Sequence, residues 1–109
     1  MLKGQAREDF EKWIEEPIQE HGRFGQLVTN IFDNIPFNMQ YGILVDWFDS
    51  VGIDLNVKSW IERGVNCWLY SVGESFRPSS YINNDNQPTR TQARQKAIEQ
   101  ANKIYNDRK

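Results

Sequence analysis

The chain has very few of the residues that build covalent cross-links and metal sites. It contains one cysteine and one histidine among 109 residues. A single cysteine cannot form an internal disulfide, so the fold must depend on a hydrophobic core, and this cysteine usage fits a reducing compartment. Cys67 and His21 lie far apart, and no paired Cys or His spacing occurs. The sequence therefore predicts no metal site.

Other absences narrow the function further. No window approaches the roughly 18 consecutive apolar residues that a membrane span needs. Residues 1–20 are charged and carry no apolar stretch of the secretory type. The phosphate-binding, dinucleotide-binding, serine-hydrolase and zinc-protease motifs are all missing. We therefore expect a cytoplasmic protein that is not an enzyme and needs no cofactor.

Aromatic residues are plentiful: the chain has four Trp, six Phe and four Tyr, which compensate for a hydrophobic content of 39%. This predicts one folded domain over residues 1–109. Charge is uneven, because residues 1–54 sum to −6 and residues 55–109 to +4. Either the two halves attract each other within the fold, or a basic face meets an anionic partner.

Two helices are predicted before residue 36. Phe10, Trp13 and Ile14 have helical spacing and predict a helix over residues 7–16, which Pro17 should end. Residues 26–35 predict a short helix.

The next helix is predicted over residues 38–51, from a broad apolar stripe. Gly52 stands where a glycine in the left-handed conformation would stop this helix. Gly42, inside it, suggests close contact with a neighbouring element.

From residue 53 the pattern alternates with the period of a strand. Residues 53–58 predict a first strand and residues 65–72 a second. In the second strand, Cys67 and Leu69 are predicted to face the core, so that Trp68 and Tyr70 point outward. Cys67 is then a small buried hydrophobe, not a reactive thiol.

The connections are predicted from turn residues. Arg63 and Gly64 form the turn of the hairpin. Residues 76–82 are expected to supply a third strand, which Pro78 confines to an edge of the sheet. Residues 83–88 lack any apolar side chain and predict a polar loop.

The last helix carries the clearest signal. Thr89 followed by Gln92 matches a capping box. One helical face then consists almost entirely of small side chains, namely Ala93, Ala97 and Ala101 with Ile104. Such a face suits close approach to a sheet. The predicted fold is thus α+β, with a small antiparallel sheet of two or three strands packed by N-terminal helices and a long C-terminal helix.

Two stretches carry a resemblance. One is Phe-Asn-Met-Gln-Tyr-Gly at residues 37–42, continued by residues 45–53; the other is the alanine-rich ending at residues 90–106. Both resemble small proteins encoded by phages and mobile elements of gut bacteria, in which a short aromatic sheet leads into one alanine-rich helix. That family has no established activity. The resemblance implies an origin and a fold, and supplies no catalytic or binding residues.

One group of carboxylates could bind a cation or take part in catalysis. It consists of Asp46, Asp49 and Asp54, with Asp33 upstream. Carboxylates three residues apart on a helix can share a divalent cation or form an acid/base pair. A solvated helix face explains them more simply, since no calcium-loop motif surrounds them.

The outer sheet face offers a more specific candidate site. It combines aromatic side chains with a cation, namely Trp60, Trp68, Tyr70, Phe76, Arg77 and Tyr81. If the face binds nucleic acid, Arg90, Arg94 and Lys96 of the basic second half would join Arg77 in contacting phosphates. Such a set can pack inside the fold, bind another protein or a second copy, or stack the bases of a single-stranded nucleic acid. We expect a protein-interaction module. Nucleic-acid binding through the basic second half is the alternative, and the net charge of −2 weighs against it.

Overall fold

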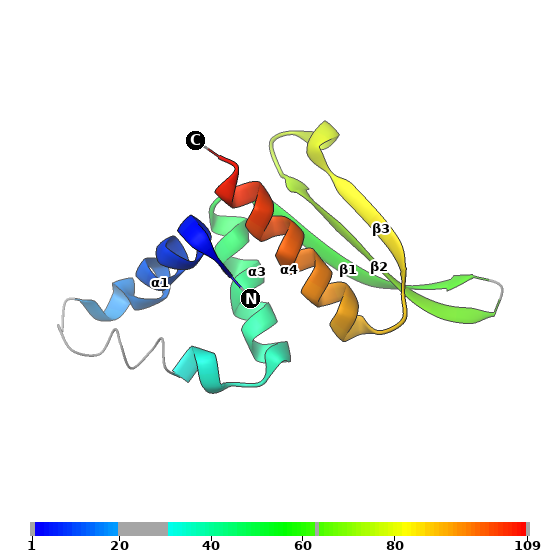
Figure 1. Cartoon of the computed structure of the whole chain (residues 1–109), viewed down its shortest axis with the longest axis horizontal. Coiled ribbons are helices and arrows are strands. Elements are labelled where there is room, and N and C mark those ends of the chain that lie inside the picture. The colour runs from blue at the N-terminus through cyan, green and yellow to red at the C-terminus, as the bar shows by residue number, and fades with distance from the viewer. Residues whose placement is uncertain (1, 20–30, 63, 109) are drawn as a thin grey trace.

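The computed structural model of the chain describes residues 2–19, 31–62 and 64–108. They form the helices α1 (Gly4–Gln19), α3 (Phe37–Ser50) and α4 (Arg90–Asn106). They also form the strands β1 (Ile53–Glu62), β2 (Val65–Glu74) and β3 (Ile82–Gln87). The strands make an antiparallel sheet in the order β1-β2-β3, and α3 and α4 pack against it (Figure 1). The predicted α+β architecture is confirmed.

Helix α1 is longer at both ends than the predicted 7–16. It continues through Pro17, because the fixed φ of proline is compatible with a helix and the missing N–H removes only one bond near the end. Its first turn is completed by α4. The Asn106 Oδ1 accepts a bond from the Ala6 N–H at 2.8 Å, and the Asn106 Nδ2 donates to the Lys3 carbonyl. No local sequence signal predicts a cap that comes from 100 residues away.

Helix α3 confirms the second strong prediction within one residue at each end. It stops at Gly52, which has a φ of +81°, and the Gly52 N–H bonds the Asp49 carbonyl. The role suggested for Gly42 is wrong. Gly42 is exposed, and a methyl group added there would meet nothing within 4 Å.

The structure describes only part of the short helix that is predicted over residues 26–35. Residues 31–34 form one helical turn, and residues 26–30 lie outside the described part. Phe32, in this turn, is buried against Phe10 with their ring centroids 4.8 Å apart.

The connection after β2 differs from the prediction. Of the predicted residues 76–82, only Ile82 is in a strand, and Pro78–Ser80 is a short 3₁₀ helix, η1, held by Ser80. The Ser80 hydroxyl accepts the Glu74 N–H at 2.8 Å and donates to the Arg77 carbonyl. The third strand is β3, within the stretch predicted as a polar loop. Its polar residues pair through their backbone with β2, so no apolar alternation marks it.

Helix α4 confirms the terminal prediction in detail. The Thr89 hydroxyl accepts the Gln92 N–H at 3.1 Å, as an N-cap should. The small side chains Ala93, Ala97 and Ala101 are fully buried, and α4 lies across β1 and β2 (Figure 1). The bare helix face does allow close approach to the sheet.

One core joins the helices to the near end of the sheet. Its largest fully buried side chains are Trp47, Phe10, Phe48, Leu44, Ile53, Ile98 and Val72. The Phe10 and Trp47 rings meet edge to face at 5.6 Å, so α1 contributes an aromatic anchor to α3. The far end of the β1–β2 hairpin extends beyond the helices (Figure 1).

Candidate interaction surface

The strand register shows which sheet face the helices cover. Residues directly opposite each other in an antiparallel pair share a face. Leu55 pairs with Val72, and both are buried; Val57 pairs with Tyr70, which is 6% exposed. The face of Val72 and Tyr70 is therefore the helix face, and the outward orientation predicted for Tyr70 is wrong.

The same register corrects the positions of Cys67 and Leu69. Both alternate with Trp68 and Tyr70, so they lie on the face opposite the helices, where each is only partly buried. Cys67 is not a core residue. We call this side of the sheet the open face. Trp60 pairs with Cys67, and the side chain of Trp60 lies outside the described part.

Trp68 is covered by a cation. The Arg90 guanidinium, from the first turn of α4, lies 4.5 Å from the centroid of the Trp68 ring. This geometry is a cation–π contact, and it encloses the ring between strand and helix. The two residues that the sequence assigned to a common binding surface are thus partners of each other.

Arg94 is used in the same way one turn later. Its guanidinium lies 4.7 Å from the Tyr41 ring centroid, and its Nη1 donates to the Asn38 Oδ1 at 2.9 Å. Burial raises the pKa of Tyr41, and the Arg94 charge opposes that rise. Arg94 therefore joins α4 to the first turn of α3 and is not a free phosphate ligand.

Tyr81 packs on the open face at the end nearest the helices. A methyl group at Gly73 would lie 2.5 Å from the Tyr81 ring, so the ring rests on the glycine backbone. The Tyr81 hydroxyl donates to Asp54 at 3.1 Å, and partial burial together with this bond raises the pKa of Tyr81. Arg77 is exposed and pairs with Glu74 at 3.4 Å.

A cluster that the sequence did not reveal surrounds Arg108. Its guanidinium donates to the Glu74 carboxylate at 3.1 Å and to the Val51 carbonyl at 2.7 Å, and lies over the Phe76 ring at 6.0 Å. The available sequence signal for this cluster was the position of Arg108, close to the end of the predicted last helix. The cluster ties the end of α4 to the α3–β1 turn.

Among the residues that the structure describes, no ion pair connects the acidic half of the chain to the basic half. Among the described residues, Arg7 pairs with Glu11 and Asp33, whereas Lys96 pairs with Glu99. In each of these pairs both residues belong to the same half of the chain, and the same is true of the pairs that Glu74 makes with Arg77 and Arg108. Within the described part of the chain, direct ion pairing between the halves therefore does not account for the uneven charge.

The predicted carboxylate cluster is dispersed. Asp33 bonds Arg7, Asp54 accepts the Tyr81 hydroxyl, and Asp46 and Asp49 are exposed on α3. Across residues 2–19, 31–62 and 64–108, no three His, Cys, Asp or Glu side chains gather as metal ligands would. His21 lies outside the described residues.

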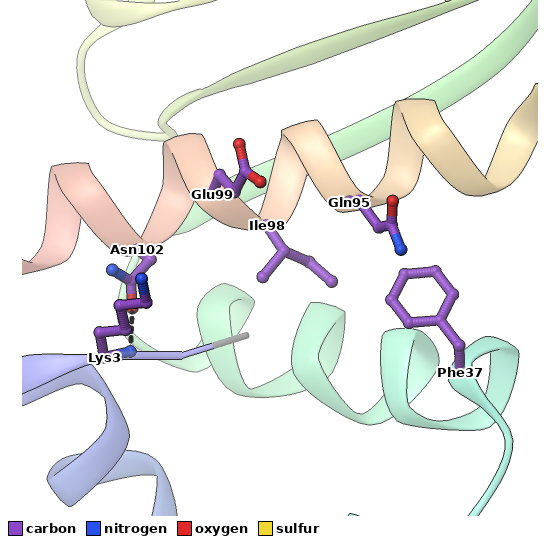
Figure 2. Close-up of a pocket in the computed structure, with 6 residues that line it drawn as sticks. All are labelled: Lys3, Phe37, Gln95, Ile98, Glu99 and Asn102. Carbon is purple, nitrogen blue, oxygen red and sulfur yellow. Dashed lines mark hydrogen bonds between the residues drawn. The ribbon is translucent and has the colours of Figure 1, made fainter. Parts of the chain in front are cut away.

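A groove of about 560 Å³ runs beside α4 (Figure 2). Ile98 forms its floor, and the other lining residues are Lys3, Phe37, Gln95, Glu99 and Asn102. The Lys3 N–H donates to the Asn102 side chain at 2.9 Å at one end of the groove, and Phe37 lies at the other. Among the described residues, the groove is open and is lined by one cation, one anion and two amides, which are not arranged for acid–base or nucleophilic chemistry.

The far end of the hairpin is the least supported part of the sheet. We call residues 58–62 and 64–67 the arm. Strand β3 pairs with β2 only from Trp68 onward, so the arm is a two-stranded ribbon. Ile61 is 72% exposed and Val65 is 61% exposed. Gly64, with a φ of +79°, fits the predicted turn, although Arg63 lies outside the described part.

Comparison with known proteins gives no match: no family model, no curated protein and no solved structure is similar to this chain. Helices long and apolar enough to cross a membrane are likewise absent from the described residues.

Proposed function

We propose that this protein is a non-enzymatic interaction module that binds another polypeptide through its arm. The observation that carries the proposal is the exposure of Ile61 and Val65 on a ribbon that neither a helix nor a third strand supports. A two-stranded hairpin alone is marginally stable in water, and a partner that covers it would supply the missing burial.

Nucleic-acid binding, the alternative, has weaker support. It needs free cations beside free aromatic faces, but Arg90 and Arg94 already stack on Trp68 and Tyr41. Gel shift with single strands at low salt tests it directly, because phosphate contacts would make any affinity fall steeply with salt. The origin in a phage or mobile element stays a prediction.

Site-specific photo-crosslinking tests the proposal. A photoreactive amino acid replaces Ile61 on the arm, and a matched control carries it at the exposed Lys96 of α4. In extract of the native host, position 61 should give a discrete polypeptide adduct, and position 96 should not. Equal labelling at both positions, or no polypeptide adduct at position 61, would refute the interaction through the arm.

A further inference from the structure

The arm joins the rest of the sheet at Trp68. Strand β3 pairs with β2 as far as Trp68, whose partner is Gln87, and from there toward the hairpin turn the described part of β2 pairs with β1 alone. The register between β2 and β3 also shifts between Trp68 and Tyr70. Such an irregularity bends a strand and increases its twist. The sheet therefore bends most easily at Trp68, where it narrows from three strands to two (Figure 1).

A tight connection holds Trp68 from two directions. Only two residues separate β3 from α4. Gln87, the last residue of β3, is the ladder partner of Trp68, and Arg90, the first residue of α4, lies over the Trp68 ring at 4.5 Å. The Thr89 hydroxyl accepts the Gln92 N–H at 3.1 Å, which fixes the first turn of α4. One short segment therefore holds both the backbone and the side chain at the base of the arm.

The contact of Arg90 with Trp68 stands at the border of the covered part of the helix face. Trp68 itself is partly buried. On the same face, Ser59 lies opposite Trp68 and Ile61 lies beyond it, and both are exposed. A cation–π contact at such a partly exposed site contributes little compared with a fully buried core side chain. The contact can therefore open and close while the core of the domain stays folded.

We propose that the Arg90–Trp68 contact is a latch that holds the arm in one direction relative to α4, and that the arm swings about Trp68 when the latch opens. The contribution of the latch to binding rests on the proposed function. With the latch closed, the exposed Ile61 and Val65 keep one position relative to the helices, so the arm is already ordered when it meets a partner and loses less conformational entropy on binding. Arg90 and Trp68 then act as positioning residues, which need not touch the partner.

Distances between spin labels, measured by double electron–electron resonance, report the direction of the arm. In a Cys67→Ser background, which removes the single cysteine, one nitroxide is attached at Val65→Cys and another at Lys96→Cys on α4; both positions are exposed. Val65 lies three residues from Trp68, roughly 10 Å along the strand, so it moves when the arm swings. A contact of this strength shifts an equilibrium about twofold to fivefold. Arg90→Ala should therefore raise the population outside the main distance peak by this factor.

Matched variants show whether the latch is responsible. Trp68→Leu should have the same effect as Arg90→Ala, and the double variant should add nothing to either, because all three remove the same contact. Arg90→Lys keeps a cation above the ring and should retain most of the narrow peak. Arg77→Ala removes an exposed arginine that pairs with Glu74 at the other end of β2, and should leave the peak unchanged.

Three results would overturn the latch. The first is a distance peak that Arg90→Ala leaves unchanged, and the second is a double variant whose effect is the sum of the single ones. The third comes from labels at Asp46→Cys on α3 and Lys96→Cys on α4. If Arg90→Ala broadens this distance as well, the contact holds the helices together and does not direct the arm. A sharp α3–α4 distance beside a broadened arm distance supports the latch.

The same variant separates the latch from the proposed function, because the distance measurements need no partner. Arg90→Ala should lower the yield of the photo-adduct at position 61 about twofold to fivefold. An unchanged yield beside a broadened arm distance would overturn the role of the latch in binding and leave the interaction through the arm standing. If position 61 gives no adduct with or without Arg90, the proposed function fails, and the distances alone decide whether the arm swings.

Discussion

Replacing Gly42 with alanine should make the protein more stable. Gly42 lies inside α3 with an ordinary helical backbone, is exposed, and would meet nothing within 4 Å with its new methyl group. Alanine restricts the unfolded chain and suits the helix, which is worth about 0.5–1 kcal/mol at such a position. For a domain of this size, that gain corresponds to a rise of roughly 3–6 °C in the melting temperature.

Urea unfolding followed by circular dichroism measures this change. The midpoint should rise while the slope stays constant, because the surface exposed on unfolding hardly changes. Gly52→Ala is the matched control at the end of the same helix. Gly52 has a φ of +81°, so the same methyl group should destabilise the protein, by about 1–2 kcal/mol. Destabilisation by Gly42→Ala would contradict the reasoning, since it would mean that another element touches this glycine.

Three further changes test the packing. Tyr105→Phe removes the hydrogen bond that the Tyr105 hydroxyl donates to Asp9, and should cost about 1 kcal/mol at neutral pH in urea unfolding. That bond lowers the pKa of Asp9, and burial with the same bond raises the pKa of Tyr105 to about 12. The difference in unfolding free energy between the wild type and Tyr105→Phe should therefore shrink as the pH falls through the lowered pKa of Asp9. It should also shrink as the pH rises from about 10 toward about 12. A difference that stays constant with pH would contradict the assignment. Arg90→Ala should lower the unfolding free energy by about 0.5–1 kcal/mol and red-shift the Trp68 fluorescence. The fluorescence is measured in a variant whose other tryptophans are replaced by phenylalanine. An unshifted spectrum would show that the contact is not maintained in solution. Ala97→Leu should overpack the α4–sheet contact and lower stability by about 1–3 kcal/mol in thermal unfolding, and a neutral effect would argue against close packing of α4 on the sheet.

Helix α4 shows which features can be predicted from this sequence. Its cap at Thr89 and its face of small side chains are both local patterns, and the structure has both. The same holds for α3 and the glycine that ends it. These elements are set by residues within one or two turns of each other, so the sequence of the segment carries the whole signal.

Strand β2 shows where such prediction fails. Alternation correctly identified a strand, but both of its faces carry apolar side chains. The inner face was assigned from Cys67 and Leu69, whereas pairing with β1 puts Tyr70 and Val72 inside. Val72 was the available signal, because it has the same parity as Tyr70 and follows it directly on that face. Strand β3 was missed for a different reason, since backbone pairing at a sheet edge does not require apolar side chains.

Three arginines of the basic half are engaged in contacts within the fold. Arg90 covers Trp68, Arg94 covers Tyr41, and Arg108 lies over Phe76 while holding Glu74. Arg90 and Arg94 of α4 thus lie over a ring of strand β2 and a ring of helix α3, whereas Arg108, just beyond α4, lies 6.0 Å from the Phe76 ring, which stays 66% exposed. Two of the large apolar side chains that the described residues expose, Ile61 and Val65, lie on the arm, where none of the described helices and no third strand packs against them. We expect a partner that covers these two side chains to gain binding energy there.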